Sequence, residues 1–291
     1  MNTINTGTYS SVWRNKYRAA TMQQVLRKAL VAEAVCEVDR SNSFYIHNPY
    51  SSQPTASVAA IDGSYAVTAW TTTEDTLSIT DEVTYGEHIY DFERLLANYD
   101  LFANRTNEQA YAVAQAIDIY VVNNLLEAGT TDYTTPAGGF TTAANIPVII
   151  SNLCSKVMGY AEAYKGLFLI IENTDVPGFI QAQLASGFSY SDAALNNGFI
   201  GHYGGVDIYV VRTGTFTDAT TTTASGSTTW SNSGRRVFGV KNVATYAQPG
   251  GLNFEEKGVT LKTGKEFVTY GYVGFKLWAT KAALVVDILL A

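Results

Sequence analysis

The side chains that most often catalyse reactions or bind metals are few in this sequence, and they are not spaced for either task. The three histidines, His47, His88 and His202, lie far apart, and no H-E-x-x-H or similar metal-binding spacing surrounds them. The two cysteines, Cys36 and Cys154, are too few and too isolated to form a disulfide framework or a thiolate metal site. We therefore predict no metal site.

Two glycine-containing stretches approach known catalytic or phosphate-binding motifs without matching them. The stretch Gly187–Ser191 lacks the final glycine of the G-x-S-x-G nucleophile elbow, and no G-x-x-x-x-G-K-[ST] motif is present to bind phosphates. The stretch Gly201–Gly205 does not match a dinucleotide-binding fingerprint and is more typical of a turn between two elements. The sequence thus predicts no cofactor.

Two pairs of neighbouring carboxylates, Asp81 with Glu82 and Glu255 with Glu256, are the remaining candidates for acid-base chemistry. Successive side chains of an extended chain point to opposite faces, so neither pair is expected to act as a general acid and base. Because no nucleophile, base or metal set can be assembled, we predict that the protein has no catalytic residues and is not an enzyme.

The charges are divided unevenly along the chain, and their pattern is more informative than the net charge of -7. Residues 1–32 contain five basic side chains and no acidic one, whereas residues 33–100 contain twelve acidic side chains and only Arg40 and Arg94. The acidic balance argues against binding nucleic acid by phosphate neutralisation. The basic segment could pair with the acidic one within a subunit or between neighbours, or it could be a solvated tail.

Length and composition favour a folded chain that stays out of membranes. A sequence of 291 residues, 46% hydrophobic and 15% charged, suggests one large or two modest domains with a sizeable core. No signal-peptide stretch begins it, and no apolar run approaches the roughly 20 residues that span a bilayer. We expect a soluble protein made in the cytoplasm.

The strongest local pattern is a long helix over Thr106–Ala128. Residues Thr106 to Gln109 fit an S/T-x-x-E/Q capping box at its start, and Gly129 ends it. Apolar residues recur at three- and four-residue steps, which predicts one face laid along the core. They are Ala110, Val113, Ala114, Ile117, Val121 and Leu125.

The sequence before this helix predicts a polar N-terminal arm, a short helix and several strands. A projecting β-hairpin is predicted, because Asp62-Gly63 is a hairpin turn signal between two strand-like runs. The predicted elements are the arm 1–17, the helix 21–35, strands at 43–46, 56–60 and 65–70, and strand character over 76–92.

The sequence after the long helix predicts alternating helices and strands, then a β-rich end. The apolar run 167–171 is typical of a strand buried on both faces. The Thr/Ser/Gly-rich segment 213–234 predicts a mobile surface loop, whose ends Phe216 and Trp230 could anchor. The other predictions are a helix from about Asn145 to Gly166, a helix from Asp175 to about Ala185, and strands at 206–211, 236–243, 258–262, 266–279 and 284–289.

The order of these elements resembles that of the HK97-fold major capsid proteins of tailed bacteriophages. The family-like stretches are Tyr90–Arg94, which leads into the long helix, Asn197–Tyr209, and Tyr270–Tyr272 near the end. The resemblance covers nearly the whole chain and lies mainly in the order of the elements. It implies an α+β fold with an N-terminal arm, an extended E-loop hairpin, a long spine helix, and peripheral and axial domains.

The resemblance also implies where these parts lie. They are the N-terminal arm at 1–38, the E-loop at 39–73, a peripheral domain with the spine helix at 74–146, an axial domain at 147–236, and C-terminal strands of the peripheral domain at 237–291.

The implied function is structural. Such subunits assemble into pentamers and hexamers that close an icosahedral shell around double-stranded DNA, which they contact without sequence specificity. The implied partners are other copies of the chain, a separate scaffolding protein, a portal and possible decoration proteins, with no membrane; the implied location is the virion capsid, after synthesis in the host cytoplasm. From the charge asymmetry we select Arg14, Lys16 and Arg18 as candidate intersubunit contacts.

One departure from some relatives carries a prediction. Those relatives weld the shell with an isopeptide bond from an E-loop lysine, but this chain has no lysine between Lys28 and Lys156, so we predict no such weld. Two alternative functions stay open at this point: an encapsulin-like nanocompartment that holds cargo protein, and a surface adhesin or carbohydrate-binding β protein that presents some of the 19 tyrosines and 4 tryptophans.

Overall fold

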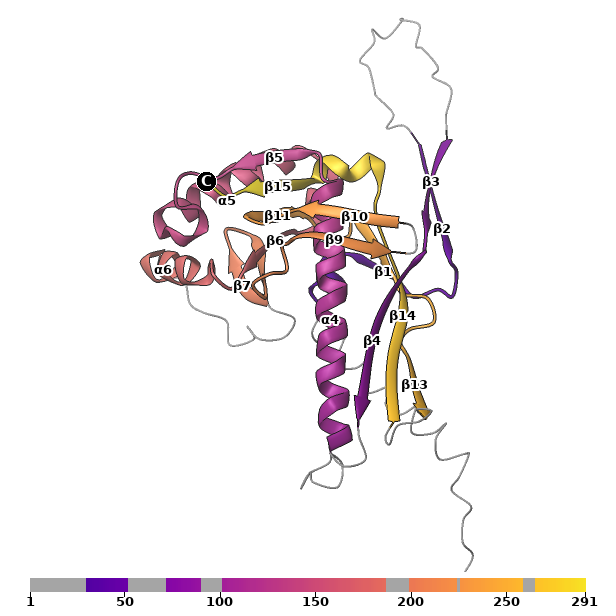
Figure 1. Ribbon diagram of the computed structural model, residues 1–291. Coiled ribbons are helices and arrows are strands. Elements are labelled where there is room, and N and C mark those ends of the chain that lie inside the picture. The colour runs from indigo at the N-terminus through magenta and orange to yellow at the C-terminus, as the bar shows by residue number, and fades with distance from the viewer. Residues whose placement is uncertain (1–29, 52–71, 90–100, 187–198, 224–225, 259–264) are drawn as a thin grey trace, which may run out of the picture.

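A computed structural model describes residues 30–51, 72–89, 101–186, 199–223, 226–258 and 265–291. Two β-sheets lie beside one long helix, and a two-stranded hairpin projects from the body (Figure 1). The predicted α+β class is confirmed. Several sequence predictions lie outside the described residues: the arm, the strands at 56–60 and 65–70 with their Asp62-Gly63 turn, most of the strand at 258–262, and the stretches Gly187–Ser191 and Tyr90–Arg94.

The long helix α4 spans Leu101–Ala128, so the predicted start at Thr106 is wrong. Residues 101–105 include leucine, alanine and arginine, which favour a helix, and they contain no glycine or proline that would stop one. The side chains of Thr106 and Gln109 are 7% and 3% exposed and are packed against the body instead of forming a capping box. The end is as predicted, because the Gly129 N–H donates to the carbonyls of Leu125 and Leu126 at 3.2 Å.

One face of α4 lies against a five-stranded sheet whose centre is the long strand β14, Lys265–Leu277. The other strands are β1 Glu37–Asp39, β12 Ala244–Ala247, β13 Asn253–Gly258 and β4 Asp81–Ile89. The Tyr120 hydroxyl donates to Asp81 at 2.6 Å and the Gln109 amide donates to Glu87 at 3.0 Å. Helix and sheet are therefore joined by hydrogen bonds as well as by apolar packing.

A six-stranded mixed sheet forms the second part of the body, in the order β5-β15-β11-β6-β8-β7. Its strands are β5 Thr131–Thr134, β15 Val285–Leu289, β11 Arg235–Val240, β6 Leu167–Glu172, β8 Val206–Val211 and β7 Phe199–Tyr203. All six residues of β6 are buried, which confirms the strand predicted from the apolar run. One continuous apolar cluster joins this sheet, α4 and the first sheet.

The remaining helices are short. They are α2 Val31–Val35, α5 Ile146–Val157 and α6 Val176–Ser186, with 3-10 turns η1 Gly139–Thr141, η2 Ala143–Asn145, η3 Ala161–Lys165 and η4 Ala279–Leu284. Phe179 of α6 stacks on Phe140 of η1, with ring centroids 5.5 Å apart. Gly178 permits this approach, since a Cβ atom there would lie 2.0 Å from the Phe140 carbonyl oxygen.

The helix predicted from about Asn145 to Gly166 is too long. Helix α5 ends at Val157, shortly before Gly159, and Tyr160, which the predicted helix included, lies beyond it and is 46% exposed. Gly166 has φ +98° and ends the η3 turn instead of the helix. Glycine at 159 lowers helix propensity, and the chain closes with the tighter turn.

A projecting hairpin consists of β2, Tyr45–Ser51, paired antiparallel with β3, Thr72–Ser78 (Figure 1). The strands of the predicted hairpin, 56–60 and 65–70, lie between β2 and β3 in the sequence and outside the described residues. The base of the β2–β3 hairpin is fixed by a small apolar cluster of Leu77, Ile79, Ala247 and Trp278. Strand character was predicted without a break over 76–92, but β3 ends at Ser78 and β4 begins at Asp81.

The segment 213–234, predicted as a loop, contains a hairpin of β9, Asp218–Thr223, and β10, Gly226–Ser231. Threonine is β-branched and favours strands, which explains why the threonine-rich run forms two paired strands. The loop prediction relied on the Thr, Ser and Gly composition and missed this preference. Phe216 is 4% exposed and anchors one end as predicted, while Trp230 lies opposite Ala219 in the ladder. Strands β1, β5, β7, β12 and β13 were also missed, and β7 occupies the first part of the turn predicted at Gly201–Gly205.

The predicted domain boundaries at 146/147 and 236/237 do not follow the sheets. The six-stranded sheet pairs β11 with both β6 and β15, and pairs β15 with β5, so it takes strands from both sides of each boundary. The strands of a sheet pair although they are distant in sequence, so dividing the chain into consecutive segments could not predict which strands share a sheet. The division into peripheral and axial domains stays a prediction.

Candidate functional site

The residues considered for chemistry are spread over the fold. Each histidine within the described residues lies beside a carboxylate, His47 by Glu74, His88 by Glu266 and His202 by Asp207, on three separate elements. Burial raises the pKa of the Cys36 thiol to about 12 and also raises that of Cys154, so both cysteines are poor nucleophiles. Within the described residues, no cluster of three histidine, cysteine or acidic side chains could hold a metal ion.

The two neighbouring carboxylate pairs are separated as predicted. Asp81 accepts the Tyr120 hydroxyl on the face of β4 beside α4, whereas Glu82 is exposed. Glu255 pairs with Lys257 and accepts the Tyr270 hydroxyl at 3.1 Å, whereas Glu256 pairs with Lys265. The two carboxylates of each pair are successive residues of one strand and point to opposite faces of the sheet, so neither pair can share a proton.

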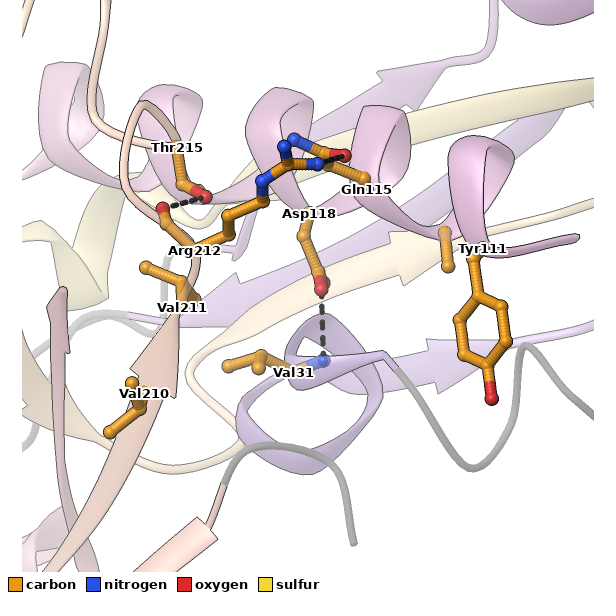
Figure 2. Close-up of a pocket in the computed structure, with 9 residues that line it drawn as sticks. Val31, Tyr111, Gln115, Asp118, Val210, Val211, Arg212 and Thr215 are labelled. Carbon is orange, nitrogen blue, oxygen red and sulfur yellow. Dashed lines mark hydrogen bonds between the residues drawn. The ribbon is translucent and has the colours of Figure 1, made fainter. Parts of the chain in front are cut away.

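A cavity of about 290 Å³ opens where α4 meets α2, β8 and the turn after β8 (Figure 2). Its wall is mainly apolar, with one buried carboxylate and one guanidinium. The residues that line it are Val31, Tyr111, Ala114, Gln115, Asp118, Val210, Val211, Arg212 and Thr215. Figure 2 shows Asp118 directed from α4 toward Val31, and Arg212 directed toward Gln115, whose side-chain oxygen it contacts at 3.1 Å.

Asp118 attaches the first described residues of the chain to the long helix. Its carboxylate accepts the backbone N–H of Ala32 at 3.0 Å and that of Val31 at 3.4 Å, the orphan donors at the start of α2. Burial raises the pKa of this carboxyl from its ordinary value of 3.8 to about 7, although the two N–H groups stabilise the ionised form. The site is a tether between two segments, since its acid already has backbone partners.

Asn123 forms a second tether on α4. Its side-chain N–H groups donate to the carbonyls of Ile119 at 2.7 Å and Thr215 at 2.8 Å, and its oxygen accepts the Asn232 amide at 3.0 Å. Asn123 and Asn232 are both 0% exposed. The helix is thereby fixed to both ends of the segment that carries the β9–β10 hairpin. The role of Asn123 could not be predicted from the sequence, because its partners Thr215 and Asn232 lie far along the chain.

A buried ion network stabilises the six-stranded sheet. The guanidinium of Arg236 contacts Asp175 at 2.5 Å and Glu172 at 3.2 Å, and Arg236 is 4% exposed. Phe216 covers the guanidinium at 5.1 Å from its ring centroid, and the Gly214 N–H donates to Glu172 at 3.0 Å. Strand β11, the end of β6 and the turn after β8 are therefore held in one arrangement.

The five-stranded sheet has an aromatic and acidic face turned away from α4, which we call the outer face. Tyr272 is 36% exposed, while its neighbours Val273 and Thr269 point the other way and are 1% and 0% exposed. Phe44, which is 44% exposed, meets Tyr272 edge to face with ring centroids 5.4 Å apart. Exposed Glu82 lies opposite Tyr272 in the ladder. Such a group of exposed aromatics is typical of a contact surface.

The hairpin base covers one end of the outer face. Gly274 lies two residues beyond Tyr272 and on the same face, and a Cβ atom there would lie 2.7 Å from Ile79 Cγ1. Only glycine lets the segment after β3 pack this closely on β14. The residues selected from the sequence, Arg14, Lys16 and Arg18, lie outside the described residues. The contact between Phe44 and Tyr272 was not predicted, because the two residues meet only in the folded chain.

Comparison of the sequence with family models and with curated proteins gives no match to either. Comparison of the fold gives clear similarities. A chain of the capsid of cyanophage P-SCSP1u matches with a TM-score of 0.65 at 15% identity, over 91% of this chain and 89% of that chain. A chain from Mycobacterium phage Che8 matches with a TM-score of 0.63 at 18% identity, over 86% and 88%.

A virus-like particle from Pyrococcus furiosus matches with a TM-score of 0.61 at 10% identity, over 94% of this chain and 99% of that chain. These similarities extend over almost all of each chain. The protein therefore has the fold of capsid-forming chains.

Proposed function

We propose that this chain is the major capsid protein of a tailed bacteriophage, a structural subunit of an icosahedral shell that encloses double-stranded DNA. The observation that carries the proposal is the similarity of fold to a cyanophage capsid chain over 91% of this chain and 89% of that one. The long helix and the projecting hairpin, the features by which the sequence resembles HK97-fold capsid proteins, support the same proposal. The role is structural instead of enzymatic.

The parts of the proposed subunit follow from this assignment. Hairpin β2–β3 is the E-loop, α4 is the spine helix, α4 with the five-stranded sheet is the peripheral domain, and the six-stranded sheet with α5 and α6 is the axial domain. The proposed domains thus follow the sheets, with β5 and β15 in the axial part. Residues 1–29 with α2 form the N-terminal arm.

The mechanism is geometric. Pentamers and hexamers of one chain need a subunit whose body keeps its shape while its projecting parts contact neighbours. The Asp118, Asn123 and Arg236 contacts each connect segments distant in sequence, which supports a body that moves as a unit. We propose that the hairpin and the arm overlap adjacent subunits, and that the spine helix transmits changes of orientation during expansion.

The acidic balance of the chain suits a container for DNA, because weak contact with phosphates leaves the packaged DNA free of tight binding. We propose that the shell forms with a separate scaffolding protein and a portal, and that decoration proteins can bind outside. The protein would be made in the host cytoplasm and end in the virion. Among the described helices, none is long and apolar enough to cross a membrane.

Two alternatives receive less support. A nanocompartment shell would share the fold, but of the three chains compared above the two with the higher TM-scores come from phages. An adhesin or carbohydrate-binding β protein does not fit a fold similar to capsid-forming chains over most of their length.

The contents of purified particles distinguish a capsid from a nanocompartment. Particles would be made in cells that also express the neighbouring genes, treated with nuclease, and opened. We expect protected double-stranded DNA and no stoichiometric cargo protein. Protected protein cargo without DNA would overturn the bacteriophage assignment in favour of the nanocompartment.

A further inference from the structure

The outer face of the five-stranded sheet carries exposed aromatic residues. Helix α4 packs on the opposite face, and the hairpin base covers only the end near Gly274. Next to this covered end, Phe44 and Tyr272 are 44% and 36% exposed, and Tyr45, at the start of β2, is 65% exposed. Tyr45 points away from the sheet, because the next residue, Ile46, packs in the apolar cluster at the hairpin base. Phe44 and Tyr272 are in contact, and two exposed aromatic rings in contact indicate a surface that another group covers.

The charge on this face is negative. Exposed Glu82 lies opposite Tyr272, and among the described residues no cation lies within ion-pair distance of it. Glu255, on the adjacent strand β13, forms an ion pair with Lys257 at 2.9 Å and accepts a hydrogen bond from the Tyr270 hydroxyl. The face therefore offers carboxylates and tyrosine rings side by side, which suits an occupant with both cations and aromatic rings.

One segment of the chain has that composition. Residues Trp13–Arg18 read Trp-Arg-Asn-Lys-Tyr-Arg, with three cations and two aromatic rings within six positions. The surrounding residues 1–32 contain no acidic side chain. Arginine and lysine bind tyrosine rings through cation-π contacts and carboxylates through charge-assisted hydrogen bonds, so both kinds of group on the outer face would be used.

We propose that the outer face, formed by Phe44, Glu82, Glu255, Tyr270 and Tyr272, binds the segment Trp13–Arg18 of a second copy of this chain. The inference rests on the proposed shell function and assigns a receiving surface to the arm residues Arg14, Lys16 and Arg18. We select a second copy because the described chain begins at Leu30 against α4, so its own arm would have to pass around the sheet to reach this face, whereas the arm of a neighbour in the proposed shell would not. Contact between copies would then couple each arm to the base of a neighbour's hairpin.

Charge reversal on each side tests the contact. The arm variant is Arg14→Glu/Lys16→Glu/Arg18→Glu, the face variant is Glu82→Lys/Glu255→Lys, and the control Glu127→Lys/Asp132→Lys changes two exposed carboxylates by the same charge away from this face. Shell yield is measured by sedimentation after expression with the neighbouring genes. We expect the arm and face variants each to lower the yield at least tenfold, and the control to stay within twofold of the original chain.

Mixing distinguishes contact between copies from contact within one chain. An equimolar mixture of arm and face variants places an acidic arm opposite a basic face and a basic arm opposite an acidic face. We expect the mixture to recover at least half of the original yield, which a contact within one chain cannot do. Normal yield from either reversed variant alone, or failure of the mixture when the chain carrying both reversals assembles, would overturn the proposal.

A second face variant and the assembly of the original chain distinguish failure of the arm contact from misfolding and from failure of the proposed function. Glu82→Lys alone leaves the Glu255–Lys257 pair intact, so it replaces the face variant if that variant melts at a lower temperature than the control. If the original chain forms no shells under any condition, the proposed function itself fails. If it forms shells and the reversed variants do so equally well, only the arm contact is wrong.

Discussion

The carboxylate of Asp118, in the middle of α4, accepts the backbone N–H of Ala32 at 3.0 Å across 86 positions of sequence. This bond and the adjacent one from Val31 attach α2 to the long helix α4. The attachment is made by an ionisable group that is buried in the fold, and its strength therefore depends on pH.

Stability of the unassembled subunit should fall as pH rises through the range set by Asp118. Burial raises the pKa of Asp118 from 3.8 to about 7, so the folded state holds this proton more tightly than the unfolded state does. Its contribution is complete below about pH 4 and is lost as pH rises toward about 7. Between pH 5.5 and 7.5 we expect a loss of about 2 kcal/mol, since one pKa unit corresponds to about 1.4 kcal/mol.

Urea unfolding of the original chain and of Asp118→Asn at several pH values would measure this. The variant keeps the side-chain shape and removes the titration, so its free energy of unfolding should vary less over the same range. Equal pH dependence in the two proteins would show that Asp118 titrates normally.

Replacing Asn123 with alanine should lower the free energy of unfolding by about 2–4 kcal/mol. The change leaves the Asn232 amide and the Thr215 carbonyl without their buried partner, and each unsatisfied group costs about 1–3 kcal/mol. Asn124→Ala is the matched control, because Asn124 donates only to the Tyr120 carbonyl one turn back. Chemical unfolding of both variants should separate them by more than 1 kcal/mol; equal losses would refute the role given to Asn123.

Arg236→Ala should destabilise the subunit by about 3–5 kcal/mol, because it leaves Asp175 and Glu172 as uncompensated charges in the interior. Arg40→Ala removes an exposed pair with Glu33 and should cost less than about 1 kcal/mol. The comparison needs only thermal or denaturant unfolding. A loss for Arg236→Ala as small as that for Arg40→Ala would mean that the network is solvated in solution.

Assembled shells should contain no covalent links between subunits through the hairpin. Lysine is absent from positions 29–155, which include both hairpin strands, so the hairpin has no amine for an isopeptide bond. Intact particles boiled in denaturant should run on a gel as a single band near 31.5 kDa. A ladder of subunit multiples would contradict this prediction.

The sequence predicted the elements whose signals are local. The end of α4 at Gly129 and the buried strand β6 each depend on neighbouring residues, a glycine in one case and an apolar run in the other. The start of α4 was missed because residues before Thr106 also favour a helix, and the burial of Thr106 depends on a sheet assembled from distant strands.

The contact surfaces were less accessible to sequence reasoning. The charge asymmetry pointed to Arg14, Lys16 and Arg18, but the partner surface exists only after β14 has brought Tyr272 beside Phe44, 228 positions away. Asn123 and Asn232 likewise meet only through folding. Such contacts between distant residues produce no periodic pattern in the sequence, so they can be identified only from the folded structure.

Negative-stain electron microscopy with particle sizing, on the chain expressed with and without its genomic neighbours, tests the central claim most directly. The account predicts closed shells of uniform size, or rings of five and six subunits, when the neighbouring genes are present. A stable monomer under all of these conditions would contradict it.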